Sequence, residues 1–135
     1  MNTALERAES LIATIPDYPK PGVLFRDIAP LLADGGAFDV TVRALIEPFL
    51  GDFNVVAGVD ARGFILAGAA ASQAKCGLVP IRKKGKLARP AFTEEYELEY
   101  GTAALEVQND VPAGSRVLLI DDRWKTPAYR ALTAF

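Results

Sequence analysis

Histidine is absent from this chain of 135 residues, and cysteine occurs once, as Cys76. Without an imidazole, the Ser-His-Asp and Cys-His mechanisms are excluded, and so is an ordinary Cys/His zinc site. A single cysteine cannot form an internal disulfide, and we interpret Cys76 as a small buried apolar residue. Carboxylates, lysines and tyrosines are the side chains left to carry protons.

Long apolar runs and a strong excess of one charge are also missing. The longest uninterrupted apolar stretch, Phe64 to Ala71, is too short to span a bilayer, and the N-terminus lacks the basic-then-apolar order of a signal peptide. The net charge is −2 and the pI is 5.2. We therefore expect a cytoplasmic protein with no membrane and no nucleic-acid partner, although a local basic patch can still bind a phosphorylated small molecule.

Hydrophobic spacing predicts one α/β domain. Apolar residues recur with helical spacing in three segments and form short continuous or alternating runs elsewhere. We predict a helix that begins at the Thr3/Glu6 capping box and ends near Pro16, and a second helix over 37–50, capped by Asp34 and kinked by Pro48. The remaining predicted elements are an extended run over 23–28, a βαβ unit over 55–59, 65–75 and 78–81, a hairpin within 83–112 that stands off the parallel sheet, and a buried strand over 117–120.

Two basic segments follow predicted strands and suit an anionic ligand. In Asp60-Ala61-Arg62-Gly63-Phe64, a guanidinium meets the first N–H groups of a helix, which favours phosphate; an Asp60–Arg62 loop brace is an equally good interpretation. In Arg82-Lys83-Lys84-Gly85-Lys86, followed by Arg89, five cations occupy eight positions. This clustering favours a polyphosphate ligand over a solvated surface, and nucleic-acid binding is the weaker alternative.

Three further segments carry candidate side chains. Leu98-Glu99-Tyr100-Gly101 places a carboxylate and a phenol on opposite faces of a hairpin strand, or simply an exposed glutamate on a β-ribbon. Phe25-Arg26-Asp27 lies after a proline-stiffened loop and can stack on a flat ring, or it is a core Phe beside a local Arg–Asp pair. Asp121-Asp122 follows the last predicted strand, and ligands of open α/β sheets bind just beyond such strand ends.

Five segments, taken in order, resemble the adenine phosphoribosyltransferases of the type I phosphoribosyltransferase class. They read PKPGVLFRDIAPLL, VAGVDARGF, VPIRKKGKL, YELEYG and VLLIDD. The resemblance implies a parallel sheet with flanking helices and a β-hairpin hood. It also implies a homodimer that transfers the 5-phosphoribosyl group from phosphoribosyl pyrophosphate to N9 of adenine, which gives AMP and pyrophosphate in purine salvage. The implied cofactor is Mg²⁺, bound mainly through phosphoribosyl pyrophosphate rather than by direct protein ligands.

The resemblance also assigns roles to particular residues. Glu99 would handle the proton near the purine, and Phe25 would stack on adenine while the backbone from Leu24 to Arg26 reads the edge of the base. Asp121 and Asp122 would face the ribose hydroxyls and the Mg²⁺ hydration shell. Phosphoribosyl pyrophosphate would further contact Arg62, Arg82, Lys83, Lys86 and Tyr100.

The sequence departs from the family after residue 122, where we divide it into a phosphoribosyltransferase domain (1–122) and a divergent tail (123–135). The family follows its acid pair with an Ala-Thr-Gly-Gly-Thr type loop around the ribose 5-phosphate, and Arg123-Trp124-Lys125-Thr126-Pro127 stands in that place. We interpret the tail as the product of a frame change or an altered gene, or else as a substitute helix that packs Trp124, Tyr129, Leu132 and Phe135 over the sheet. We therefore expect a fold that is incomplete at the C-terminus and reduced activity. The alternative is a non-catalytic binding or interaction protein that keeps the fold.

Overall fold

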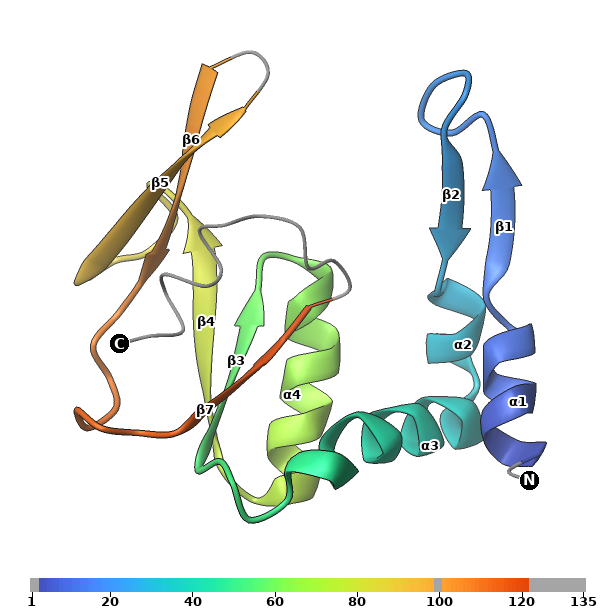
Figure 1. Ribbon diagram of the computed structural model, residues 1–135, viewed down its shortest axis with the longest axis horizontal. Coiled ribbons are helices and arrows are strands. Elements are labelled where there is room, and N and C mark those ends of the chain that lie inside the picture. Colours follow the sequence, from blue (N-terminus) through green and yellow to red (C-terminus); the bar gives the residue numbers. More distant parts are fainter. Residues whose placement is uncertain (1–2, 99–100, 122–135) are drawn as a thin grey trace. The chain divides into compact units, whose positions relative to one another are not determined.

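The computed structural model describes residues 3–98 and 101–121 of the chain. By their internal contacts the residues form two compact units, Met1–Pro48 and Phe49–Phe135, and each unit is described by itself. Figure 1 labels the helices and strands along the chain. No helix in the described part of the chain has both the length and the apolar character needed to cross a membrane.

The first unit combines helices with a two-stranded antiparallel sheet. Its elements are α1 (Thr3–Ser10), β1 (Ala13–Pro16), β2 (Leu24–Asp27), α2 (Ala29–Ala33) and α3 (Gly35–Ile46), followed by a 3₁₀ turn, η1 (Glu47–Phe49). One residue from each helix, Ala8, Leu31 and Ala37, is buried in the small core that joins them. Asp34 caps α3 by accepting a hydrogen bond of 2.9 Å from the backbone N–H of Ala37, as the sequence predicts.

Two boundaries in this unit differ from the prediction. The first helix ends at Ser10 rather than near Pro16, because residues 13–16 pair with β2 as a strand, with Ile15 opposite Phe25. The β-branched Thr14 and Ile15 suit a strand at least as well as a helix, and their apolar spacing alone did not distinguish the two. The second helix begins at Gly35 and ends at Ile46, and Pro48 lies in the 3₁₀ turn that follows. Helix α2 was not predicted.

The second unit is built on a five-stranded sheet of order β5-β6-β4-β3-β7. Its elements are β3 (Val55–Val59), α4 (Arg62–Ala74), β4 (Gly77–Lys83), β5 (Phe92–Leu98), β6 (Gly101–Val107) and β7 (Val117–Ile120). Strand β3 runs parallel to both β4 and β7, which confirms the predicted α/β class and the βαβ unit. The predicted strands at 55–59 and 117–120 are confirmed residue by residue, because each is a short, almost purely apolar run.

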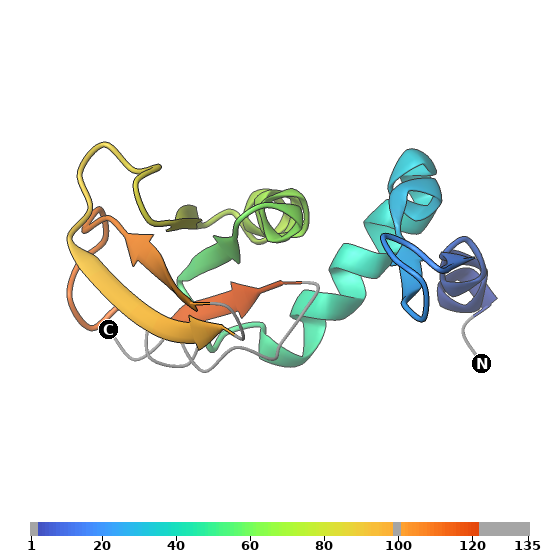
Figure 2. The same ribbon diagram turned by 90° about the horizontal axis from the view of Figure 1, so that it is seen from above.

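Helix α4 lies against one face of this sheet, over β3 (Figure 2). A Cβ atom on Gly58 would lie 2.6 Å from Cβ of Ala67 and 2.8 Å from the carbonyl oxygen of Gly63, so the helix and the strand approach more closely than side chains allow. The apolar core of the unit consists of Val55, Ala57, Val59, Val79, Ile81, Leu105 and Val107, with Val111, Val117 and Leu119 packed against it.

The hairpin of β5 and β6 is joined to the sheet at its base. Val107 of β6 lies opposite Ile81 of β4, and Leu105 lies opposite Lys83, whereas residues 101–104 pair with β5. The predicted antiparallel hairpin is therefore present, but it extends the parallel sheet through β4 and rises beyond the end of β4 only in its distal half (Figure 1). The hairpin was predicted to stand off the parallel sheet, and it does so only in its distal half, because the backbone groups of β4 need a partner on that side.

Candidate functional site

Three parallel strands end at the same edge of the sheet and carry polar residues there. Val59 of β3 lies opposite Ile81 of β4, and Gly58 lies opposite Ile120 of β7. The residues that come next, Asp60, Arg82 and Asp121, therefore gather at the carboxyl edge of the sheet, where open α/β sheets bind their ligands.

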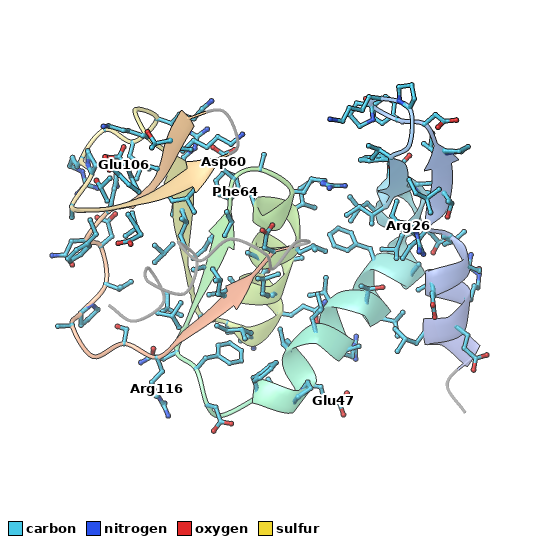
Figure 3. The ribbon with its side chains drawn as sticks, turned by 45° about the horizontal axis from the view of Figure 1, so that its top comes forward. Arg26, Glu47, Asp60, Phe64, Glu106 and Arg116 are labelled. Carbon is cyan, nitrogen blue, oxygen red and sulfur yellow. The ribbon has the colours of Figure 1, made fainter. Side chains whose placement is uncertain are left out.

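Arg82 is held at this edge by a carboxylate and an aromatic ring. Its Nε lies 3.4 Å from Oδ2 of Asp60, and its guanidinium lies 5.7 Å from the centroid of the Phe64 ring. The Asp60 side chain is 9% exposed and that of Arg82 is 34% exposed, so the pair is partly withdrawn from water. Figure 3 labels Asp60 and Phe64 at this end of the sheet. Asp60 thus braces Arg82 on the neighbouring strand, a contact that the sequence did not suggest.

The amino end of α4 forms another part of the same edge. The helix begins at the half-buried Arg62, and Ala61 before it provides no side-chain cap, so no side chain at the cap position satisfies the N–H groups of the first turn. The peptide bond between Asp60 and Ala61 is cis. A helix start beside a guanidinium is suited to phosphate oxygens.

Asp121 lies directly against the start of this helix. A Cβ atom on Gly63 would be 2.9 Å from the carbonyl oxygen of Ile120 and 3.1 Å from Oδ1 of Asp121. Only glycine at position 63 leaves this space without a shift of β7. The last strand and the helix start therefore bring the Asp121 carboxylate beside the predicted phosphate-binding groups.

The basic segment after β4 forms a turn, which we call the basic turn (Lys83–Lys86). Gly85 has a φ of +90°, a conformation that favours glycine, and the backbone N–H of Lys86 donates to the carbonyl of Lys83 at 3.3 Å. All three lysines of the turn are exposed. Arg89, farther along, pairs instead with Asp110 at 2.9 Å, so it belongs to a local structural pair.

A buried carboxylate lies beneath the basic turn. Glu106 of β6 accepts a hydrogen bond of 2.8 Å from the backbone N–H of Gly85 and another of 2.8 Å from the hydroxyl of Thr93. These two bonds, the first above all, hold the pKa of Glu106 below its ordinary value, and the charge of Lys84 adds to the effect. Sequence reasoning missed both Glu106 and Thr93; the one available signal was a charged residue between the apolar Leu105 and Val107.

The predicted adenine-binding residues lie on β2 of the first unit. Leu24, at 62% exposure, and Arg26 share the exposed face of the strand, while Phe25 is half-buried on the other face. The Phe25 ring meets the ring of Tyr18 edge-on, with centroids 5.1 Å apart and planes at 63°. Tyr18 was not predicted as a neighbour. Figure 3 labels Arg26 on this strand.

Several predicted residues fall outside the part of the chain that the structure describes. They are Glu99, Tyr100, Asp122 and the whole of 123–135. Of the predicted phosphoribosyl pyrophosphate residues that are described, Arg82, Lys83 and Lys86 lie on β4 and the turn after it, and Arg62 and Asp121 lie where α4 starts and β7 ends.

Comparison with known proteins gives close relatives of one kind. No protein-family model matches the chain. The adenine phosphoribosyltransferase of Renibacterium salmoninarum is 55% identical over 130 residues, which cover 96% of this chain and 71% of that protein. That of Arthrobacter sp. (strain FB24) is 57% identical over 114 residues, which cover 84% of this chain and 62% of that protein. The chain thus spans about two thirds of the length of these relatives.

Solved structures agree with the sequence comparison. The adenine phosphoribosyltransferase of Rhodothermus marinus superposes with a TM-score of 0.78 at 44% identity, covering 87% of this chain and 68% of that one. The Saccharomyces cerevisiae enzyme, in complex with an imino-altritol bisphosphate and adenine, superposes with a TM-score of 0.82 at 33% identity, covering 90% of this chain and 73% of that one.

A parallel sheet that gathers a guanidinium, a helix start and a carboxylate at its carboxyl edge defines an α/β protein of the open-sheet class. Within that class the relatives identify the protein family. The chain belongs to the adenine phosphoribosyltransferase family, and its sheet and helices have the type I phosphoribosyltransferase fold.

Proposed function

We propose that this chain binds phosphoribosyl pyrophosphate and adenine and transfers the 5-phosphoribosyl group to N9 of adenine, as in purine salvage. The bond from the ribose C1 to the pyrophosphate oxygen breaks, a bond from C1 to N9 forms, and the proton on N9 leaves. AMP and pyrophosphate are the products. Family membership supports this reaction, and the single observation that carries it is Arg82, fixed by Asp60 and Phe64 at the carboxyl edge of the sheet.

Arg82 is the main contact that we assign to pyrophosphate. Its Nε faces Asp60, and we assign the two terminal nitrogens of the guanidinium to phosphate oxygens. Negative charge grows on the pyrophosphate as it leaves, and donors that are already in place stabilise that charge without reorganising. Arg62, Lys83 and Lys86 would add to the same field.

Mg²⁺, when bound with phosphoribosyl pyrophosphate, neutralises part of the charge on the leaving group. The donors present fit an ion held mainly through the substrate. Within the described residues no group of three or more His, Cys, Asp or Glu side chains is placed to hold a metal ion, while Asp121 offers one carboxylate at the edge. We assign Asp121, with Asp122, to the ribose hydroxyls and the ion's water shell.

Strand β2 is the element that we assign to adenine. In the described part of the chain its one sheet partner is β1, and we assign the backbone of β2 to the edge of the purine. Leu24 supplies exposed apolar surface, and Phe25 is the ring that we assign to stacking. Glu99 would accept the N9 proton, and Tyr100 would belong to the hood that excludes water during the transfer.

We further propose that the protein is a cytoplasmic homodimer and that its activity is low. Position 123 onward lacks the glycine-rich loop that the family places around the ribose 5-phosphate. Losing about three charge-assisted hydrogen bonds, at roughly 1.5–3 kcal/mol each, would weaken substrate binding by about 5–9 kcal/mol.

The test is AMP formation by the purified chain with adenine, phosphoribosyl pyrophosphate and Mg²⁺, beside the Renibacterium salmoninarum enzyme. We expect a rate lower by about three to six orders of magnitude, and we expect Arg82→Ala and Glu99→Gln to abolish it. A rate equal to that of the relative would show that 123–127 replaces the loop. A folded chain that forms no AMP yet binds adenine would favour the non-catalytic alternative.

A further inference from the structure

Glu106 stands out among the described residues because it is the one polar or charged residue in the buried class, at 6% exposure. It lies on β6, opposite Arg82 of β4 on one side and opposite Thr93 of β5 on the other. Residues that lie directly opposite in a sheet project from the same face, so Arg82, Glu106 and Thr93 form a row across three strands. Figure 3 labels Glu106 in this part of the sheet.

Both oxygens of this carboxylate are used. Oε1 accepts from the backbone N–H of Gly85 and Oε2 accepts from the Thr93 hydroxyl, each at 2.8 Å, and no ion pair with Glu106 occurs within the described residues. A packed apolar residue could fill the same space, but it could not accept these two hydrogen bonds. The bonds to Gly85 and Thr93 are therefore a contribution that an apolar residue cannot make.

That contribution is to the shape of the basic turn. The N–H of Gly85 lies in the middle of the turn, at the residue whose φ is +90°. By holding this N–H from inside the sheet, Glu106 fixes the backbone between Lys84 and Lys86 while the lysine side chains remain exposed. The turn also continues the sheet, because the N–H of Lys84 donates to the carbonyl of Ala104 at 3.0 Å.

We propose that the buried Glu106 and the exposed Thr93 form a clamp that holds the basic turn in the shape that binds the pyrophosphate part of the substrate, so that Glu106 is a positioning residue for the transfer. This inference rests on the proposed function, because it takes pyrophosphate as the ligand of the turn. The clamp acts through the turn's backbone, and neither side chain touches the substrate. The hydroxyl of Thr93 completes the clamp by fixing the second oxygen of the carboxylate.

The charge of Glu106 also affects the basic turn when no anion is bound. Lys83, Lys84 and Lys86 repel one another, and a carboxylate beneath them offsets part of that repulsion before any anion binds. Removing the charge should therefore loosen the turn as well as remove a hydrogen bond.

The experiment measures binding of inorganic pyrophosphate to the full chain by isothermal titration calorimetry, for the parent and for Thr93→Val, Thr93→Ser and Glu106→Gln. We expect Thr93→Val and Glu106→Gln to bind at least about tenfold more weakly. Thr93→Ser keeps the hydroxyl and should bind pyrophosphate like the parent. If Thr93 served stability alone, folded Thr93→Val would bind as well as Thr93→Ser. The Thr93 variants leave the carboxylate in place, so the test stands even if Glu106→Gln does not fold.

Two controls separate the possible failures. Thr41→Val is a matched Thr-to-Val change at a hydroxyl that has no hydrogen-bond partner among residues 3–98 and 101–121, and it should leave pyrophosphate binding unchanged. Arg82→Ala should abolish binding if the edge of the sheet is the pyrophosphate site. A folded parent chain that binds no pyrophosphate overturns the proposed function and this inference with it. A parent that binds, with Thr93→Val and Glu106→Gln binding equally well, overturns this inference alone.

Discussion

Gly63 is the residue at which the start of α4 touches the end of β7. A methyl group there would meet the carbonyl oxygen of Ile120 at 2.9 Å and Oδ1 of Asp121 at 3.1 Å, and a backbone oxygen cannot move aside as a flexible side chain can. We expect Gly63→Ala to lower the free energy of unfolding by about 1–3 kcal/mol, as overpacking usually does. Chemical denaturation measures this change.

Gly68 provides the matched control on the same helix. A Cβ atom at this position would meet nothing within 4 Å, and its helical backbone suits alanine. Gly68→Ala should therefore raise the free energy of unfolding by up to about 1 kcal/mol. Equal effects of the two substitutions would contradict the close approach at Gly63.

Thr41 of α3 has a buried hydroxyl for which the described part of the chain offers no hydrogen-bond partner. Replacing it by the isosteric valine removes a polar atom that burial has stripped of water, and the two residues have similar helix propensities. We expect Thr41→Val to change the free energy of unfolding by between zero and about +1 kcal/mol. A clear loss of stability in denaturation would mean that the hydroxyl has a partner after all.

The start of α3 is the element whose stability depends most visibly on pH. Asp34 accepts hydrogen bonds from Arg7, at 2.6 Å, and from the N–H of Ala37, and these bonds, that of Arg7 first, lower its pKa to about 2. A lowered pKa means that the carboxylate stabilises the fold above its ordinary pKa, and that this contribution is lost as the pH falls from about 4 to about 2. We expect Asp34→Asn, which still caps a helix, to make the acid-induced loss of stability less steep in that window.

Asp39 allows the same substitution at an exposed pair. It bonds to Arg43 one turn along α3, at 2.7 Å, where both side chains are at least half exposed. Such surface pairs contribute little, so Asp39→Asn should leave the acid profile close to that of the parent. Acid titrations of the two variants, followed by circular dichroism, make the comparison. An equal change in both would assign the effect to general charge rather than to the cap.

Helices and strands could be predicted from the sequence where a single pattern of apolar residues dominates. Val55–Val59 and Val117–Ile120 are uninterrupted apolar runs, and both strands were placed correctly. Residues 11–16 carry two signals at once, helical spacing and β-branched side chains, and the choice between them is made by pairing with β2, which lies about ten residues farther along. Local sequence contains no information about that pairing, so the end of α1 was misplaced.

At the scale of the whole molecule, the sequence identified the carboxyl edge of the sheet but not its internal contacts. Asp60, Arg82 and Asp121 were expected at strand ends, and the parallel sheet brings them to one edge. The pairing of Asp60 with Arg82 and the burial of Glu106 depend on which strands are neighbours and in what register. Register across β4, β6 and β5 is a tertiary property, so these contacts could not be read from the residues alone.

The two proposed ligands should slow amide hydrogen exchange in different units of the chain. Pyrophosphate is assigned to the second unit and adenine mainly to β2 of the first. In hydrogen exchange followed by mass spectrometry, we expect pyrophosphate to protect peptides covering 60–64 and 82–86, and adenine to protect peptides covering 18–27. Ligand binding protects amides by shifting the opening equilibrium, so the effect should grow with ligand concentration. Protection of 18–27 by pyrophosphate alone would contradict this assignment.

Strand β6 pairs with β4 over only part of its length, so the hairpin is anchored to the sheet at one end. Leu105 to Val107 pair with β4, and the carbonyl of Ala104 accepts from the N–H of Lys84, while the three residues from Gly101 to Ala103 lie past this contact with β5 as their neighbour. At about 3.4 Å per residue, this segment is roughly 10 Å long, so a tilt of about 5° at its base moves Gly101 by about 0.9 Å. Glu106 lies within the part of β6 that pairs with β4. We therefore expect a shift of the basic turn that moves this carboxylate to cause a larger displacement at Gly101 than at Glu106.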